Sequence, residues 1–197
     1  MNGGSAGSLR RGFLSVVPPP DVLAALDEAL VPVRTVAPPR LSWSRPSQWH
    51  LTAQFLGPVA DVDALVRAVG RTVAGESVFA VGLGGVGAFP SPDRASVVWV
   101  GLDEGVDALA SLAGAVERAT APLGYQSEGR PYAAHLTVAR ARRPCPVGSV
   151  LASIGDGPFG RTWDVREIVL FESDTRPTGA VYREVAHVPF GAGQPNR

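Results

Sequence analysis

The sequence predicts an α+β fold in which two similar lobes pack around a central cleft. The chain has 197 residues, a length that suits one domain. Its apolar residues follow helical spacing in some segments and strand alternation in others. The order strand, helix, strand, helix, strand occurs in each half, and each half carries the tripeptide His-Leu-Thr at the same place, at residues 50–52 and 135–137. We therefore expect one bilobal domain over residues 10–190.

The first half is expected to contain three strands and two helices. The strands cover residues 11–17, 49–56 and 77–83, and the helices cover residues 21–31 and 61–74. The second helix has the clearest pattern, because one face carries Val62, Leu65, Val66, Val69 and Val73. Residues 32–46 are rich in proline and arginine and are expected to form a loop.

The second half follows a similar order. Strands are expected over residues 95–101, 133–140, 164–171 and 181–188, and helices over residues 104–121 and 147–154. The run Gly-Leu-Gly-Gly-Val-Gly at 82–87 matches the dinucleotide-binding pattern, but the Phe-Pro-Ser-Pro that follows cannot form the helix that this pattern requires. We expect a flexible turn there and no cofactor. Residues 1–9 and 191–197 are expected to be a disordered leader and tail.

The charge balance excludes several classes of function. The chain has 18 basic and 18 acidic residues, so tight binding along a long nucleic acid is not expected, although a local cluster is enough to hold one phosphate. All the basic residues are arginines. A lysine nucleophile and nucleotidyl transfer through a lysyl intermediate are therefore impossible.

Other compositional features indicate a cytoplasmic protein. Cys145 is the single cysteine, so no intramolecular disulfide can form. Residues 1–8 lack the apolar core of a signal peptide. No apolar run approaches the roughly 20 residues that span a bilayer. We expect a monomer that has no contact with a membrane.

The two His-Leu-Thr segments carry the chemistry. Side chains alternate along a strand, so His50 and Thr52 share one face, as do His135 and Thr137. Two imidazoles and two hydroxyls on facing strands form a cage for a phosphate. At neutral pH one histidine can be neutral and the other charged, as the opening of a cyclic phosphodiester by water requires. The hydroxyls can donate to the non-bridging oxygens, and no metal is needed.

The sequence resembles the two-histidine (2H) phosphoesterase superfamily, and within it the RNA 2′,3′-cyclic phosphodiesterases (the ThpR or LigT group, also called 2′-5′ RNA ligases). The resemblance covers nearly the whole chain and rests first on the paired motifs. Further matches are Arg11-Gly-Phe-Leu-Ser-Val-Val-Pro-Pro19, Gln54-Phe-Leu-Gly57, Phe89-Pro-Ser-Pro92, Val138-Ala-Arg140, and Phe171-Glu-Ser173 with Gly179 and Tyr182. The chain departs from the family at Ala134, where proline is usual.

The resemblance implies a bilobal fold with an antiparallel sheet in each lobe. It implies that His50 protonates the departing 3′ oxygen, that His135 activates water, and that Thr52 and Thr137 hold the phosphate. The product is then a 2′-phosphomonoester. It also places Arg140 at the phosphate, although strict alternation puts Arg140 on the far face of its strand unless a bulge intervenes.

Aromatic and basic residues near the motifs offer further contacts. Tyr132 and Trp43 are candidates for stacking a terminal base, whereas Trp49 and Phe55 are expected in the core. Flanking phosphates could be contacted by three arginines that lie nearby in sequence: Arg40, Arg45 and Arg130. His187 is expected to be structural, and two histidines without a third ligand make a poor metal site.

Four functions stay open at this point. The first is hydrolysis of 2′,3′-cyclic phosphates at RNA ends, with tRNA fragments or small cyclic nucleotides as conceivable substrates. The second is ATP-independent ligation, in which a 5′-hydroxyl replaces water. The third is a non-catalytic module that binds RNA ends or nucleotides. The fourth is a metal hydrolase, which a chelator would distinguish from the first.

Overall fold

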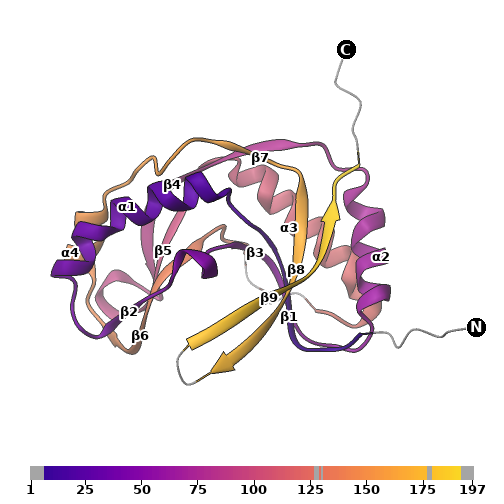
Figure 1. Ribbon diagram of the computed structural model, residues 1–197, viewed down its shortest axis with the longest axis horizontal. Helices are drawn as coiled ribbons and strands as arrows, with labels where there is room; N and C mark the ends of the chain where they lie inside the picture. The colour runs from indigo at the N-terminus through magenta and orange to yellow at the C-terminus, as the bar shows by residue number, and fades with distance from the viewer. Residues whose placement is uncertain (1–6, 127–128, 130, 177–178, 192–197) are drawn as a thin grey trace, which may run out of the picture.

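The computed structural model describes residues 7–126, 129, 131–176 and 179–191. Four α-helices and nine strands form the described part of the chain (Figure 1). The helices are α1 (Pro20–Val36), α2 (Val62–Val73), α3 (Val106–Thr120) and α4 (Gly148–Ile154). The strands are β1 (Leu9–Val16), β2 (Leu41–Trp43), β3 (Leu51–Val59), β4 (Phe79–Phe89), β5 (Ala95–Glu104), β6 (Leu136–Cys145), β7 (Trp163–Val165), β8 (Glu167–Arg176) and β9 (Gly179–Pro189). The predicted α+β class is confirmed.

The strands form one curled antiparallel sheet, in the order β7-β4-β5-β6-β3-β1-β8-β9, and β2 pairs with β6. We call β1, β3, β8 and β9 with α2 and α3 the first lobe, and β2 and β4–β7 with α1 and α4 the second lobe. The lobes meet where β3 pairs with β6, at Leu51 and Leu136. The two strands that carry the His-Leu-Thr segments are therefore neighbours at the centre of the sheet.

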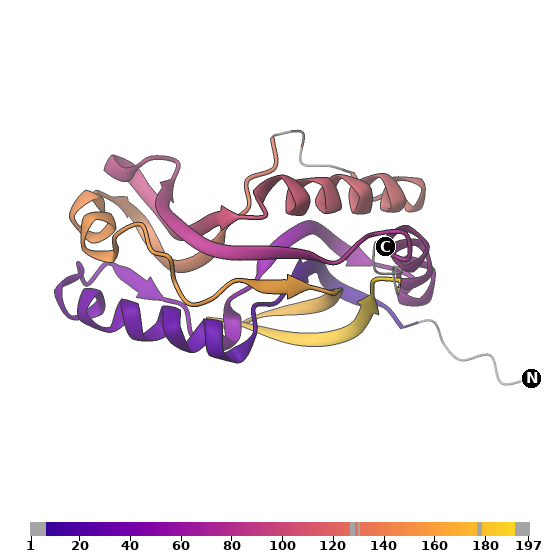
Figure 2. The same cartoon turned by 90° about the horizontal axis from the view of Figure 1, so that it is seen from above.

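The lobes do not coincide with the two halves of the chain. Helix α1 follows β1 of the first lobe but lies beside α4 in the second, whereas α3 follows β5 of the second lobe but contacts α2 and β3 in the first. Figure 2 shows the consequence, with α1 and α4 at one end of the molecule and α2 and α3 at the other. Each lobe is thus covered by one helix from each half, and this exchange ties the halves together.

Local sequence explains most of the elements. In α2, Asp61 caps the first turn by accepting from the Ala64 amide at 2.8 Å. The side chains predicted on its apolar face are buried, apart from the partly buried Val66. The core is continuous across both lobes and contains Leu51 and Leu136, which are fully buried. Among the described residues, no helix is long and apolar enough to cross a membrane.

Two expectations about loops were wrong. Residues 32–46 contain the last turn of α1, strand β2 and the start of a short 3₁₀ helix, Pro46–Gln48. Pro32 lies inside α1 and is exposed, while Leu30 and Val33 beside it are buried and hold this last turn against the core. Residues 82–87 belong to the long strand β4, in which only Gly85 has a positive φ, of 69°.

Parts of the predicted leader and tail make contacts with the folded chain. Strand β1 begins at Leu9, inside the predicted leader, and Leu9 packs in the core. The Gly7 carbonyl accepts from the Val62 amide at 3.0 Å, and the Gly191 amide donates to the Val73 carbonyl at 3.3 Å. Residues 1–6 and 192–197 of the predicted leader and tail lie outside the described residues.

Candidate active site

The pairing of Leu51 with Leu136 fixes the arrangement of both motifs. These two leucines point into the core, so the residues on either side of each point to the opposite face of the sheet. We call this opposite face the open face; it carries His50, Thr52, His135 and Thr137, all of them partly exposed. In an antiparallel pairing His50 lies across from Thr137, and His135 across from Thr52. The structure thus brings the four predicted residues together.

A β-bulge follows each motif at the same position. Between β1 and β3 the partners are Leu14–Gln54 and then Ser15–Thr52, which leaves Ala53 unmatched. Between β5 and β6 the partners are Val98–Ala139 and then Trp99–Thr137, which leaves Val138 unmatched. Each bulge lies three residues after its histidine and inverts the alternation of the residues beyond it.

The bulges return the fifth residue after each histidine to the open face. That residue is Arg140 in β6 and Phe55 in β3. Arg140 is exposed, and its positive charge acts on His50. Phe55 is 52% exposed, and its ring lies 6.0 Å from that of Phe13, between centroids. The expectation that Phe55 packs in the core was wrong, because it assumed alternation without a bulge.

Backbone carbonyls hold both imidazoles in the same way. His50 Nδ1 donates to the Gln48 carbonyl at 2.8 Å, and His135 Nδ1 donates to the Ala133 carbonyl at 2.7 Å. A carbonyl can only accept, so Nδ1 carries the hydrogen in each ring. The atom of each ring that can take up or release a proton is therefore Nε2.

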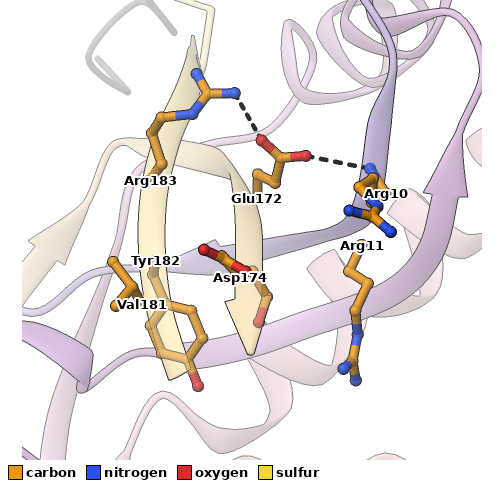
Figure 3. A pocket seen from close by; sticks show the side chains of 8 residues that line it. Arg10, Arg11, Glu172, Asp174, Val181, Tyr182 and Arg183 are labelled. Atoms are coloured by element: carbon orange, nitrogen blue, oxygen red, sulfur yellow. Dashed lines mark hydrogen bonds and ion pairs between the residues drawn. The ribbon is translucent and has the colours of Figure 1, made fainter. Parts of the chain in front are cut away.

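Aromatic rings surround each histidine. The His50 ring lies 4.7 Å from Phe13 and 5.1 Å from Tyr182, between centroids. The His135 ring lies 5.1 Å from Phe89 and 6.4 Å from Trp99. Tyr182 also lines a cavity of about 880 Å³ formed by β1, β8 and β9 (Figure 3). The rings around His50 exclude most of the solvent from this imidazole.

Burial among these rings lowers the pKa of His50 to about 4. The hydrogen bond to the Gln48 carbonyl acts in the opposite direction and raises the pKa, whereas the positive charges of Arg140 and of protonated His135 lower it further. In the free protein at neutral pH, His50 is therefore neutral. A negative charge placed between these groups would favour its protonation.

This pKa predicts a loss of stability in acid. Between pH 6.5 and pH 4 the unfolded chain binds a proton on His50 and the folded chain does not, so the free energy of unfolding falls as the pH is lowered, by up to about 3 kcal/mol from this group. Urea unfolding at pH 7 and pH 4.5 measures this loss. In His50→Gln the loss should be smaller by about 2 kcal/mol, the part of the effect that is reached at pH 4.5; equal losses in wild type and variant would contradict the prediction.

Gly87 makes room for an aromatic ring beside His135. A Cβ atom at this position would overlap the Trp99 indole. Gly87→Ala should therefore displace Trp99 and lower the free energy of unfolding by about 1–3 kcal/mol. Urea unfolding followed by tryptophan fluorescence measures the effect. Gly148→Ala is the matched control, since a Cβ there meets no atom within 4 Å, and a loss of similar size in the control would contradict the steric explanation.

The two aromatic candidates from the sequence make other contacts. Trp43 pairs with Ala139, on the face of β2 and β6 that is turned toward α1, and the Arg34 guanidinium lies 5.7 Å from its ring centroid. The Tyr132 hydroxyl donates to the Thr52 carbonyl at 2.9 Å, and burial raises the pKa of this hydroxyl. Tyr132 thus braces β3, and Trp43 is not brought to the open face.

Three other residues considered in the sequence analysis lie outside this group of side chains or outside the described residues. His187 lies on β9 between Glu167 and Glu184, at 3.0 and 3.1 Å, and these carboxylates raise its pKa. Trp49 is buried, as expected. Arg130 lies outside the described residues. Among the residues that are described, no group of three His, Cys, Asp or Glu side chains is placed to hold a metal ion.

Comparison with known proteins places this arrangement in context. The sequence profile of the 2′-5′ RNA ligase superfamily matches residues 18–177. A protein of Aeropyrum pernix named RNA 2′,3′-cyclic phosphodiesterase is 31% identical over 163 residues, which cover 80% of this chain and 86% of that protein. A Thermus thermophilus protein of the same name is 33% identical over 181 residues, or 87% of this chain and 86% of the relative.

Solved structures show the same fold. The crystal structure of the Thermus thermophilus protein TT0787 superposes with a TM-score of 0.79 at 26% identity, over 93% of this chain and 100% of the other. The structure of Escherichia coli LigT complexed with 3′-AMP superposes with a TM-score of 0.75 at 22% identity, over 92% of this chain and 98% of the other.

Proposed function

The chain belongs to the 2′-5′ RNA ligase superfamily, and from this membership we propose that it hydrolyses 2′,3′-cyclic phosphate ends of RNA to 2′-phosphomonoesters without a metal. One observation carries the proposal. Two imidazoles lie on neighbouring strands, each with Nδ1 fixed by a carbonyl and each across from a threonine. Relatives named RNA 2′,3′-cyclic phosphodiesterase support the choice of substrate.

The proposed reaction assigns one proton transfer to each histidine. His135 Nε2 takes a proton from water as its oxygen attacks phosphorus. The bond from phosphorus to the 3′ oxygen breaks, and His50 Nε2 gives its proton to that oxygen. The product carries a 2′-phosphate and a 3′-hydroxyl, and solvent then takes the extra proton from His135 and returns one to His50. Each transfer by a positioned imidazole contributes about 10²- to 10⁴-fold to the rate.

The groups around the phosphate support these roles. Thr52, Thr137 and Arg140 share the open face with the histidines and can donate to the non-bridging oxygens, where negative charge develops. The pKa of His50 is low in the free protein partly because Arg140 and His135 repel its proton. The bound phosphodiester is an anion and offsets that repulsion, so His50 becomes a competent acid when substrate is present.

Hydrolysis of a short oligoribonucleotide that ends in a 2′,3′-cyclic phosphate, with excess chelator, tests the proposal. Turnover to a 2′-phosphate is expected. A 3′-phosphate product would contradict the proposed direction of cleavage. Loss of activity with chelator would instead indicate a metal hydrolase. Binding of the oligomer without turnover would indicate a non-catalytic module.

Ligation is the alternative that the same site favours. A 5′-hydroxyl of a second RNA would replace water and lose its proton to His135, and the departing 3′ oxygen would leave a 2′-5′ linkage. Adding an RNA with a 5′-hydroxyl to the assay separates the two outcomes, since a ligase gives a joined product without ATP.

Phe55 is our candidate for stacking the terminal base, in place of Trp43 and Tyr132. It is exposed on the open face beside Phe13 and Thr52. Phe55→Ala should raise KM for the cyclic oligomer about tenfold and leave the fold intact, because a stacked base contributes about 1–3 kcal/mol. Steady-state kinetics measures this. Leu123→Ala is the control, because it removes another exposed apolar side chain; an unchanged KM for Phe55→Ala would exclude the stacking role.

The natural substrate, the oligomeric state and the cellular compartment are also matters of proposal. Fragments of tRNA and small cyclic nucleotides are conceivable substrates, because the site needs only a terminal cyclic phosphate. We propose a monomer over residues 10–190 that works in the cytoplasm. The buried free thiol of Cys145, the single cysteine, supports a reducing compartment.

A further inference from the structure

A strip of arginines extends from the active site along the second lobe. We call Arg40, Arg142 and Arg143 the arginine strip. They line a cavity of about 460 Å³ together with Pro39, Leu41 and Ser42. All three arginines are exposed. The cavity offers cationic groups and a hydroxyl, and no aromatic side chain among the described residues lines it to stack a base.

The strip lies next to Arg140. Ser42 pairs with Arg140 across β2 and β6, so the two share the open face. Ser42 also lines the cavity of the strip, so this cavity borders Arg140. Arg40 lies in the turn directly before β2, and Arg142 follows Ala141, the last residue of β6 that pairs with β2. A ligand bound at Arg140 can therefore extend onto the strip without leaving the sheet.

The strand register makes this end of β6 protrude. Ala95 pairs with Cys145, and Val97 pairs with Arg140, so residues 141–144 of β6 stand opposite Ser96 alone. The extra residues bulge away from β5. Arg142 and Arg143 lie in this bulge, which explains their exposure.

The strip concentrates positive charge on one part of the second lobe. The net charge of the whole chain is zero, and other arginines form ion pairs, such as Arg34 with Asp27 and Arg161 with Asp21. Within the described part of the chain, no carboxylate forms an ion pair with an arginine of the strip. The larger cavity at β1, β8 and β9 differs, because acidic residues line it and Glu172 accepts from Arg183 at 2.7 Å (Figure 3).

We propose that the arginine strip binds backbone phosphates of single-stranded RNA on the 5′ side of the cyclic end. This inference rests on the proposed function and deepens it: the preferred substrate is an oligoribonucleotide rather than a cyclic mononucleotide. Guanidinium groups recognise phosphates through charge and paired hydrogen bonds. Because the lining offers guanidinium groups and no ring from the described residues, the contact reads the backbone and not the base sequence.

The experiment compares two substrates and two double variants. The substrates are a 2′,3′-cyclic mononucleotide and a short oligoribonucleotide with the same cyclic end. Arg142→Gln/Arg143→Gln removes two charges from the strip. Arg67→Gln/Arg71→Gln removes two charges from exposed positions on α2 in the other lobe and is the matched control. kcat/KM is measured between about 50 and 200 mM salt.

The strip variant should lose about tenfold in kcat/KM on the oligomer and nothing on the mononucleotide. For this variant the slope of log(kcat/KM) against the logarithm of the salt concentration should be less negative, by about 0.7 for each phosphate that the variant no longer binds. The control should match the wild type on both substrates. Equal activity of strip variant and control on the oligomer would overturn the inference while leaving the proposed function intact. Absence of wild-type turnover on both substrates would instead overturn the proposed function.

Discussion

His50→Ala and His135→Ala should each lower kcat/KM for a cyclic phosphate end by about 10²- to 10⁴-fold, which includes the largest effects expected in this protein. Each variant removes one of the two Nε2 atoms that exchange protons with the substrate. Neither threonine can replace an imidazole, because a hydroxyl does not titrate near neutral pH. Single-turnover hydrolysis of the cyclic oligomer measures both variants.

His187→Ala is the matched control, because this third histidine lies on β9 between two carboxylates. It should retain wild-type activity. A loss below tenfold in either motif variant would contradict the acid–base assignment, since binding and electrostatic stabilisation alone would then account for the rate.

A substrate with sulfur in place of the bridging 3′ oxygen separates the two histidine roles. A thiolate leaves without protonation far more readily than an alkoxide, so the general acid becomes dispensable. The proposed roles predict that this substrate restores most of the activity of His50→Ala and little of that of His135→Ala. Restoration of His135→Ala alone would reverse the assignment.

The chemistry of the site could be predicted from sequence because it is local. Two residues of the same strand share a face whenever they are two positions apart, so His50 with Thr52 and His135 with Thr137 follow from alternation alone. The pattern in α2 is equally local, since its cap and its apolar face lie within one helix. Neither inference needs knowledge of a distant partner.

The bulges could not be predicted in the same way. Ala53 and Val138 are ordinary strand residues, and each is left unmatched because of the register of a neighbouring strand. That register is set by contacts with β1 and β5, which are remote in sequence from the residues concerned. Those contacts place Phe55 and Arg140 on the open face. They also explain why Phe55 is exposed and does not pack in the core.

The exchange of helices between the lobes was missed for a related reason. The repeated element order predicts two lobes, but it does not say which lobe each helix covers. Helix α1 packs with α4, and α3 with β3, through apolar faces that would fit either lobe by composition.

The equivalence of Phe55 and Arg140 becomes visible only in the folded chain. Each is the fifth residue after its histidine, and each returns to the open face after a bulge. The two lobes therefore offer the substrate similar strands, one with an aromatic and one with a cationic side chain at this position.

Arg140→Gln should lower kcat/KM for a cyclic mononucleotide about 100-fold, because a positioned donor to a developing oxyanion contributes about 10²- to 10³-fold. It should also raise the pKa of His50 in the free protein. The Arg140 charge lowers that pKa, so its removal makes protonation of His50 easier. Kinetics measures the first effect, and an NMR titration of the His50 ring measures the second.

The two readouts, taken with the free energy of unfolding, distinguish a role at the phosphate from a general defect in folding. A loosened site would lose activity and would also raise the pKa of His50, because burial is the main cause of that low pKa. It would lower the free energy of unfolding as well, whereas Arg140→Gln should leave urea unfolding at pH 7 unchanged. Arg142→Gln is the control on the same strand and should change neither quantity with the mononucleotide. If activity falls in Arg140→Gln while the titration of His50 is unchanged, the guanidinium is too distant to share a phosphate with His50. The bulge at Val138 would then orient Arg140 for some other contact.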